Sequence, residues 1–116
     1  MLIFVRLFHQ IVIRSEDRVS QRFLWRDGDN QNNPEEYEMV VMTLGAACFP
    51  CSARFVIKRN AFEHKLSDPK SAEAIVIYHY VDDFVVSFDN IEEAIRISKE
   101  VRSIHEEGGF DLRGFP

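Results

Sequence analysis

The 116-residue sequence lacks any long apolar run. Its longest hydrophobic stretches are interrupted by Arg6, His9 or Asp82, and none approaches the roughly 20 residues that a bilayer span requires. The first residues, MLIFVRLFHQIVIR, also lack the basic region and the small-residue cleavage site of a signal peptide. The sequence therefore predicts a soluble, intracellular protein, cytoplasmic or nuclear, with no membrane partner.

Cysteine is scarce. Cys48 and Cys51 are the two cysteines, spaced C-x-x-C, and one such pair without a second pair or a nearby histidine is weak evidence for zinc. The histidines are scattered along the chain without ligand spacing; they are His9, His64, His79 and His105. We interpret the cysteines as buried structural thiols.

An excess of positive charge is also missing. With 14 basic and 19 acidic residues the net charge is −5, which argues against a surface dedicated to nucleic acid. Residues 51–65 are a local exception, and they either meet phosphate or form a solvated helix face. Their charged residues are Arg54, Lys58, Arg59, Lys65 and a single acid, Glu63.

What the sequence has in quantity is apolar and aromatic side chains. Hydrophobic residues make up 46% of it, aromatic residues 12%, and there are ten phenylalanines. This composition is typical of a globular chain, and the length suits one domain rather than two. We expect the single tryptophan, Trp25, to be a packing residue.

The hydrophobic pattern predicts strands over residues 2–13, 22–26, 37–44, 74–81 and 83–88. A helix is expected over residues 50–65, with Phe55, Ile57 and Phe62 as its apolar positions. A second helix is expected to start at Asp89 or Asn90 and to end at Gly108-Gly109. This order predicts an α+β fold, an antiparallel sheet with two helices on one face.

Two adjacent aspartates, Asp82 and Asp83, lie between two of the predicted strands. Neighbouring carboxylates repel each other, and Mg²⁺ is commonly held by one or two carboxylates together with substrate phosphates. Two such ions can clamp the attacking and leaving oxygens of a phosphoryl transfer. The alternative is a polar turn in which both aspartates are solvated, although such turns favour Asn-Gly or Asp-Gly.

Four motifs in order resemble those of reverse transcriptases. They are LFHQIVI at residues 7–13, LGAACFP at 44–50, YVDD at 80–83 and EEGGFDLRGF at 106–115. Together they look most like the polymerases of BEL/Pao-type LTR retrotransposons. The resemblance covers nearly the whole chain and implies that residues 1–116 are one partial, palm-like domain of an RNA-directed DNA polymerase.

The resemblance also implies roles for individual residues. Asp82 would be the principal ligand and Asp83 the secondary ligand of two Mg²⁺ or Mn²⁺ ions that catalyse nucleotidyl transfer. Tyr80 and Val81 would face the primer terminus, although both could equally be sheet packing.

The implied partners are an RNA or DNA template-primer and a dNTP. Phe8 would stack under the sugar of the incoming nucleotide, or else belong to the core. Gly45 would allow close approach of nucleotide or template, or else form a turn with positive φ. Arg54 and Lys58 would contact template phosphate, with a solvated surface as the alternative.

One departure from the family pattern concerns the third metal ligand. In the family an aspartate precedes the aromatic gate by five residues, and here that position is Ile3, with no acid before Glu16. The fingers, thumb and ribonuclease H regions and the remaining polyprotein domains are missing, and we expect Met1 to be an accidental start. The isolated chain is therefore expected to be inactive.

Two other interpretations remain open. The first is a non-catalytic retroelement remnant, whose uncovered apolar surface is expected to cause association. The second is a phosphoacceptor receiver domain, which needs alternating strand and helix units that this chain does not offer.

Overall fold

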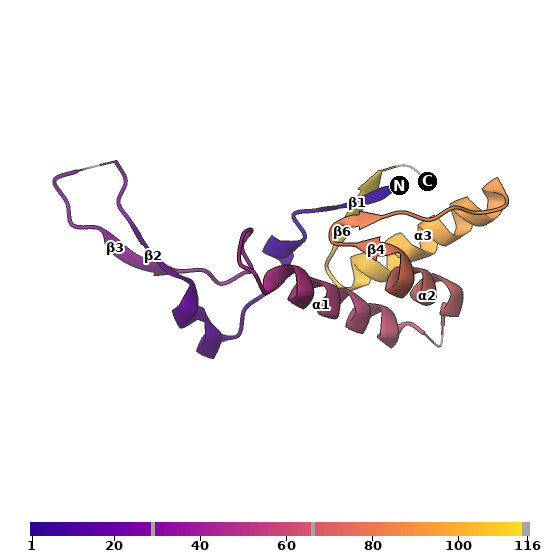
Figure 1. The fold of residues 1–116 in the computed structure, drawn as a ribbon, viewed down its shortest axis with the longest axis horizontal. Helices are drawn as coiled ribbons and strands as arrows, with labels where there is room; N and C mark the ends of the chain where they lie inside the picture. The colour runs from indigo at the N-terminus through magenta and orange to yellow at the C-terminus, as the bar shows by residue number, and fades with distance from the viewer. Residues whose placement is uncertain (29, 66, 115–116) are drawn as a thin grey trace.

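The computed structural model of the protein describes residues 1–28, 30–65 and 67–114. A four-stranded antiparallel sheet has the order β4-β5-β1-β6, and a separate two-stranded sheet consists of β2 and β3. Three α-helices pack against the larger sheet (Figure 1). The strands are β1 (Leu2–Val5), β2 (Arg22–Trp25), β3 (Glu35–Glu38), β4 (His79–Tyr80), β5 (Asp83–Phe84) and β6 (Asp111–Gly114). The helices are the 3-10 helices η1 (Phe8–Gln10) and η2 (Ser15–Gln21) and the α-helices α1 (Phe49–Glu63), α2 (Pro69–Tyr78) and α3 (Ile91–Glu107).

The larger sheet has one buried face and one open face. Side chains alternate along β1, so that Leu2 and Phe4 are buried against the helices while Ile3 points to the open side. Phe84 and Leu112, which pair with Leu2 and Phe4 on the neighbouring strands, complete the buried face. The fold is thus the expected α+β arrangement.

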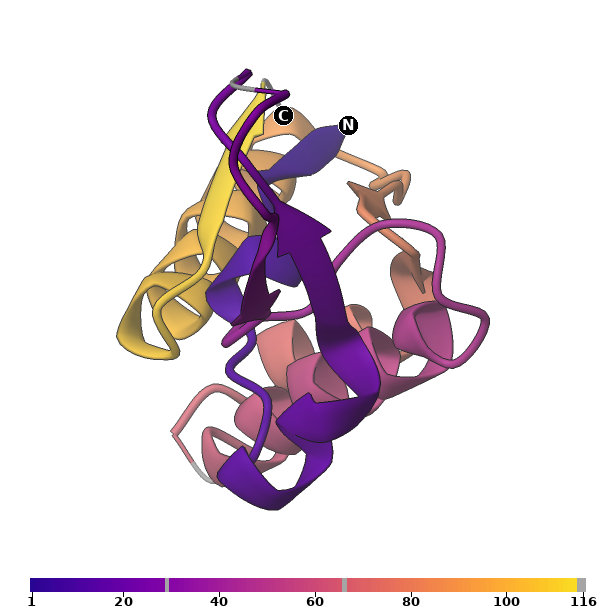
Figure 2. The same ribbon diagram turned by 90° about the vertical axis from the view of Figure 1, so that its left-hand side faces the viewer.

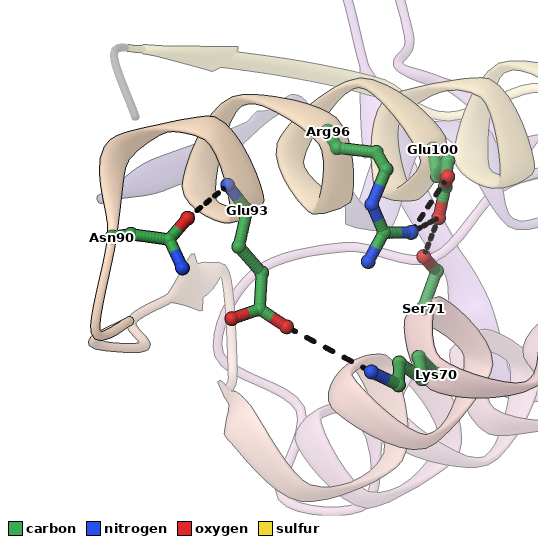
Figure 3. A network of polar contacts seen from close by, with 6 residues as sticks. All are labelled: Lys70, Ser71, Asn90, Glu93, Arg96 and Glu100. Atoms are coloured by element: carbon green, nitrogen blue, oxygen red, sulfur yellow. Dashed lines mark hydrogen bonds and ion pairs between the residues drawn. The ribbon is translucent and has the colours of Figure 1, made fainter.

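The helices are held to one another by buried side chains and by a polar network at their edge. Asn90 caps α3 by accepting a hydrogen bond from the Glu93 backbone N–H at 2.7 Å, as the sequence predicts. The Ser71 hydroxyl of α2 donates to Glu100 of α3 at 2.5 Å, and Arg96 pairs with the same carboxylate (Figure 3). These contacts fix α2 against α3 beneath the sheet.

The strand expected over residues 74–81 is mostly wrong. Pro69 opens α2 in its place, the helix runs to Tyr78, and His79–Tyr80 alone form strand β4. A short apolar run does not distinguish a buried strand from a buried helix by periodicity, and Ala72, Ala74 and Ile75 are buried here as helical residues. Over the described residues there are therefore three α-helices where two were expected.

The long strand expected over residues 2–13 is confirmed only over Leu2–Val5. β1 ends at Val5 because Arg6 adopts a φ of 54°, and η1 follows. The segments that follow β5 and β3 were also expected to be strands, but they form few strand pairings. One of these is the isolated bridge between Val12 and Val41. Strand β6 was not expected, and it completes the sheet beside β1.

An extended hairpin, β2–β3, projects from the rest of the molecule (Figures 1 and 2). The overall dimensions of 63 × 27 × 22 Å reflect this projection. Every residue of both strands is exposed, and Trp25 retains 55% of its accessible surface. The expectation that Trp25 is a packing residue is wrong, because its strand lies outside the core.

Helix α1 agrees with the expected helix over residues 50–65, but its buried face differs from the expected one. Ala53, Ile57 and Ala61 are buried, whereas Phe55 and Phe62 are 70% and 66% exposed. The cysteines are exposed free thiols, so the expectation of buried thiols is wrong. Cys48 and Cys51 lie at the start of α1, away from its buried stripe.

Within the described ranges, no helix is long and apolar enough to cross a bilayer.

Candidate functional site: the aspartate hairpin

The two aspartates lie in a tight hairpin between β4 and β5. Tyr80 pairs with Asp83, which leaves Val81 and Asp82 as a two-residue turn. Val81 has a φ of 53°, a conformation that costs a β-branched residue about 1–2 kcal/mol. A strained backbone of this kind at an exposed turn is typical of functional sites.

A row of side chains crosses the open face of the sheet at the level of Asp83. Tyr80 lies opposite Asp83, Asp83 lies opposite Ile3, and Ile3 lies opposite Arg113 on β6. Directly paired residues in antiparallel strands point to the same face, with Cβ atoms roughly 4.5–5.5 Å apart. Ile3 is therefore the immediate neighbour of an aspartate, and it is 38% exposed.

The second aspartate, Asp82, faces a different environment. It lines a cavity of about 220 Å³ together with Arg6, Phe8 and Leu44. Its backbone carbonyl accepts a hydrogen bond from the Phe4 N–H at 2.8 Å, which ties the turn to β1. Phe8 is half-buried, packs against the core and lines the cavity beside Asp82, so its role in the core is present. Its stacking under a nucleotide sugar stays a prediction.

The remaining predicted site residues are spread more widely. Tyr80 is 77% exposed beside the turn. Gly45 has a φ of 95°, so the turn that requires positive φ is present. Gly45 directly follows Leu44, which lines the cavity beside Asp82. Arg54 and Lys58 lie on α1 and do not line that cavity.

A pair of buried histidines, which sequence analysis missed, supports the hairpin from beneath. His79 Nε2 lies 3.0 Å from His105 Nε2, and His79 Nδ1 lies 3.2 Å from the backbone oxygen of Asp83. Because a carbonyl can only accept, His79 must carry its proton on Nδ1. His79 Nε2 then accepts from His105 Nε2–H, and the remaining nitrogen, His105 Nδ1, is unprotonated and has no partner among the described residues.

This chain of hydrogen bonds requires a neutral His79, because its Nε2 must accept the proton of His105 Nε2–H. Burial lowers the pKa of His79 to about 4, and burial together with the nearby His79 lowers the pKa of His105 to about 3. Phe4 stacks on His79 with ring centroids 5.0 Å apart and meets His105 edge-on. α3 thus positions the backbone of Asp83 through two neutral imidazoles.

The oxygen ligands at the hairpin suit a hard divalent cation in part. Asp82 and Asp83 supply two carboxylates, which is within the number that Mg²⁺ uses when water and phosphate complete its shell. Ile3, where a third carboxylate would be closest to Asp83, cannot coordinate. Over the described part of the chain, no three His, Cys, Asp or Glu side chains gather as a metal-binding group.

A comparison of the chain with models of known protein families finds no match, and a comparison with curated proteins finds none either.

Proposed function

We propose that the chain is a palm fragment of an RNA-directed DNA polymerase, and that Asp82 and Asp83 are its metal ligands. The observation that most supports this proposal is the register of β1 against β5. The position that the motif comparison assigns to the third acid, Ile3, lies directly opposite Asp83. The position assigned to the aromatic gate, Phe8, shares a cavity with Asp82.

The proposed chemistry is attack of a primer 3′-hydroxyl on a dNTP with loss of pyrophosphate, which depends on positioning and charge stabilisation rather than covalent catalysis. A bound divalent cation would supply neutralisation of the phosphate charges. The chain itself would hold the cation through the two carboxylates. Tyr80 and Val81 would shape the surface beside the primer end, Phe8 and Gly45 would border the nucleotide, and Arg54 and Lys58 would meet template phosphate.

A specific observation favours a second candidate, a non-catalytic remnant. Ile3 removes one acid from the site, so the chain alone is expected to hold a cation weakly and not to polymerise. Both candidates share the hairpin, and they differ in whether the remaining carboxylates still bind metal.

The test is Mn²⁺ titration, followed by electron paramagnetic resonance, of the wild-type chain and three variants. We expect weak binding by the wild type, loss of binding in Asp82→Asn, and roughly tenfold tighter binding in Ile3→Asp because affinity follows the number of charged ligands. Ile3→Asn is the matched control for Ile3→Asp, because asparagine has the shape of aspartate without its charge. It should bind Mn²⁺ as the wild type does.

Identical weak signals from the wild type and Asp82→Asn would contradict metal binding at the hairpin and leave the remnant. An Ile3→Asp variant no tighter than Ile3→Asn would contradict the proposed place of the third acid.

A further inference from the structure

The projecting β2–β3 hairpin, which we call the arm, has one aromatic face. The pairs Phe23–Tyr37 and Trp25–Glu35 lie on this face, and the Phe23 and Tyr37 rings stack with centroids 5.9 Å apart. The opposite face carries Leu24 and the salt bridges of Arg22 with Glu36 and Glu38. A two-stranded hairpin without cover is marginally stable at best in water. The aromatic face is therefore a surface that gains from a partner.

The aromatic face carries unneutralised negative charge. The Tyr37 hydroxyl donates to Glu35 at 2.9 Å, and the Trp25 indole N–H donates to Asp27 at 3.1 Å. Neither carboxylate has a basic side chain within ion-pair distance among the residues that the structure describes. A partner that covers the aromatic rings should therefore also present positive charge.

A second apolar surface lies on the same chain, at the groove between α1 and α2, and Lys65 and Glu73 are the charged residues among its described lining. The groove has a volume of about 410 Å³, within the range of pockets that hold drug-sized ligands. Its lining is mainly apolar, with Phe62 and Ile77 exposed at its walls and Glu73 as its one acid. Lys65 lies over the Phe62 ring at 5.1 Å, so a cation stands directly at the aromatic wall.

Helix α1 extends this positive charge beyond the groove. Arg54, Lys58 and Lys65 have no acidic partner in the described part of the chain, and Arg59 has only the exposed Glu63 at 3.5 Å. The arm thus offers aromatic rings bordered by the acids Asp27 and Glu35 and by Arg26. The groove offers apolar walls with Lys65 and Glu73, and further bases follow along α1. Such complementarity selects partners and orientation.

The arm cannot reach the groove of its own chain in this conformation. Figure 1 shows the arm leaving the core on the side away from α2, and the long axis of the molecule is 63 Å. We propose that the aromatic face of the arm docks into the α1–α2 groove of a second copy of this chain, with Trp25 as the anchor. Tryptophan is enriched among residues that dominate binding energy.

Sedimentation velocity of the full chain over a wide concentration range tests the proposal. The wild type should self-associate, and Trp25→Ser in the arm or Phe62→Ser in the groove should each raise the dissociation constant by at least about tenfold. Both side chains are exposed, so circular dichroism should show an unchanged fold. Ile91→Ser, which removes a still more exposed apolar side chain outside both surfaces, is the matched control and should associate as the wild type does.

Mixing the two variants gives the sharper result. Trp25→Ser keeps its groove and Phe62→Ser keeps its arm, so their mixture should form a complex that neither forms alone. A monomeric wild type, equal weakening by Ile91→Ser, or no complex in the mixture would overturn the proposal. So would a wild type that stays monomeric and instead binds a single-stranded RNA oligonucleotide through Phe62 and Lys65.

Discussion

The buried histidine pair makes the stability of the protein depend on pH between 7 and 5. In the folded state the pKa of His79 is lowered to about 4 and that of His105 to about 3, whereas both titrate near 6.5 when the chain is unfolded. The unfolded state therefore binds more protons below pH 6.5. Stability is present above that pH and is lost as the pH falls toward the folded-state values.

The magnitude follows from the difference in proton binding. At pH 5 each unfolded histidine is almost fully protonated and each folded one is almost fully neutral, so each lowers the free energy of unfolding by about 2 kcal/mol relative to pH 7. Together they account for a loss of about 4 kcal/mol, a large part of the 5–15 kcal/mol typical of a domain.

A third histidine acts in the opposite direction. His64 lies 2.9 Å from the Asn60 carbonyl and 2.7 Å from Glu107, and these two hydrogen bonds raise its pKa. The contribution of His64 to stability is complete below its pKa in the unfolded chain. It is lost as the pH rises through its higher pKa in the folded state. The variant His64→Gln should therefore steepen the loss of stability on acidification.

The measurement is urea unfolding followed by far-ultraviolet circular dichroism, because Trp25 lies on the arm and is a poor reporter of the core. His105→Leu removes one of the two titrating rings and should reduce the pH-dependent loss by about half, although it also leaves His79 Nε2 without its donor. A wild-type loss below about 1 kcal/mol, or a full loss in His105→Leu, would refute the reasoning.

Two further predictions concern local backbone structure. Val81→Gly should leave the free energy of unfolding unchanged or raise it by up to about 1 kcal/mol, because relief of the positive φ offsets the added entropy of the unfolded chain. Val85→Gly, in an extended segment without that strain, should lower it, and equal losses in both would contradict a strained turn. Asn90→Ala should lower the free energy of unfolding by about 1 kcal/mol through loss of the α3 cap, whereas Asn90→Ser should retain most of the stability that the cap contributes. Thermal unfolding of both variants distinguishes the effect of the cap from general sensitivity at this position.

The elements that the sequence predicts well have strong local signals. α3 begins at an Asn cap with acids in its first turn and ends at Gly108, so its bounds follow from capping chemistry. α1 is predicted within two residues for a similar reason, Pro50 in its first turn. α2 is missed because its apolar run lacks a polar face by which a helix could be recognised.

The site is predictable in part for a different reason. A reversal at or beside the two aspartates is predicted because they lie between two apolar segments, and the turn itself falls at Val81 and Asp82. The positive φ of Gly45 follows from the special freedom of glycine. The histidine pair is not predictable, because His79 and His105 are 26 residues apart and meet only through the packing of α3 under β4. The two strands of the arm are expected, but their exposure is missed, because an exposed strand and a core strand have the same composition.

The register of β1 bears on both candidate functions at once. A strand shifted by one residue would turn Ile3 into the core and bring Leu2 or Phe4 to the open face beside Asp83, because side chains alternate. The buried Leu2 and Phe4 prevent this shift, so position 3 is held next to Asp83 whatever residue occupies it. An acid at position 3 would therefore need no rearrangement of the core to meet the hairpin carboxylates. For that reason Ile3→Asn and Ile3→Asp form a pair in which the fold is constant and only the charge at position 3 changes, and a difference in their metal affinity is attributable to the added carboxylate.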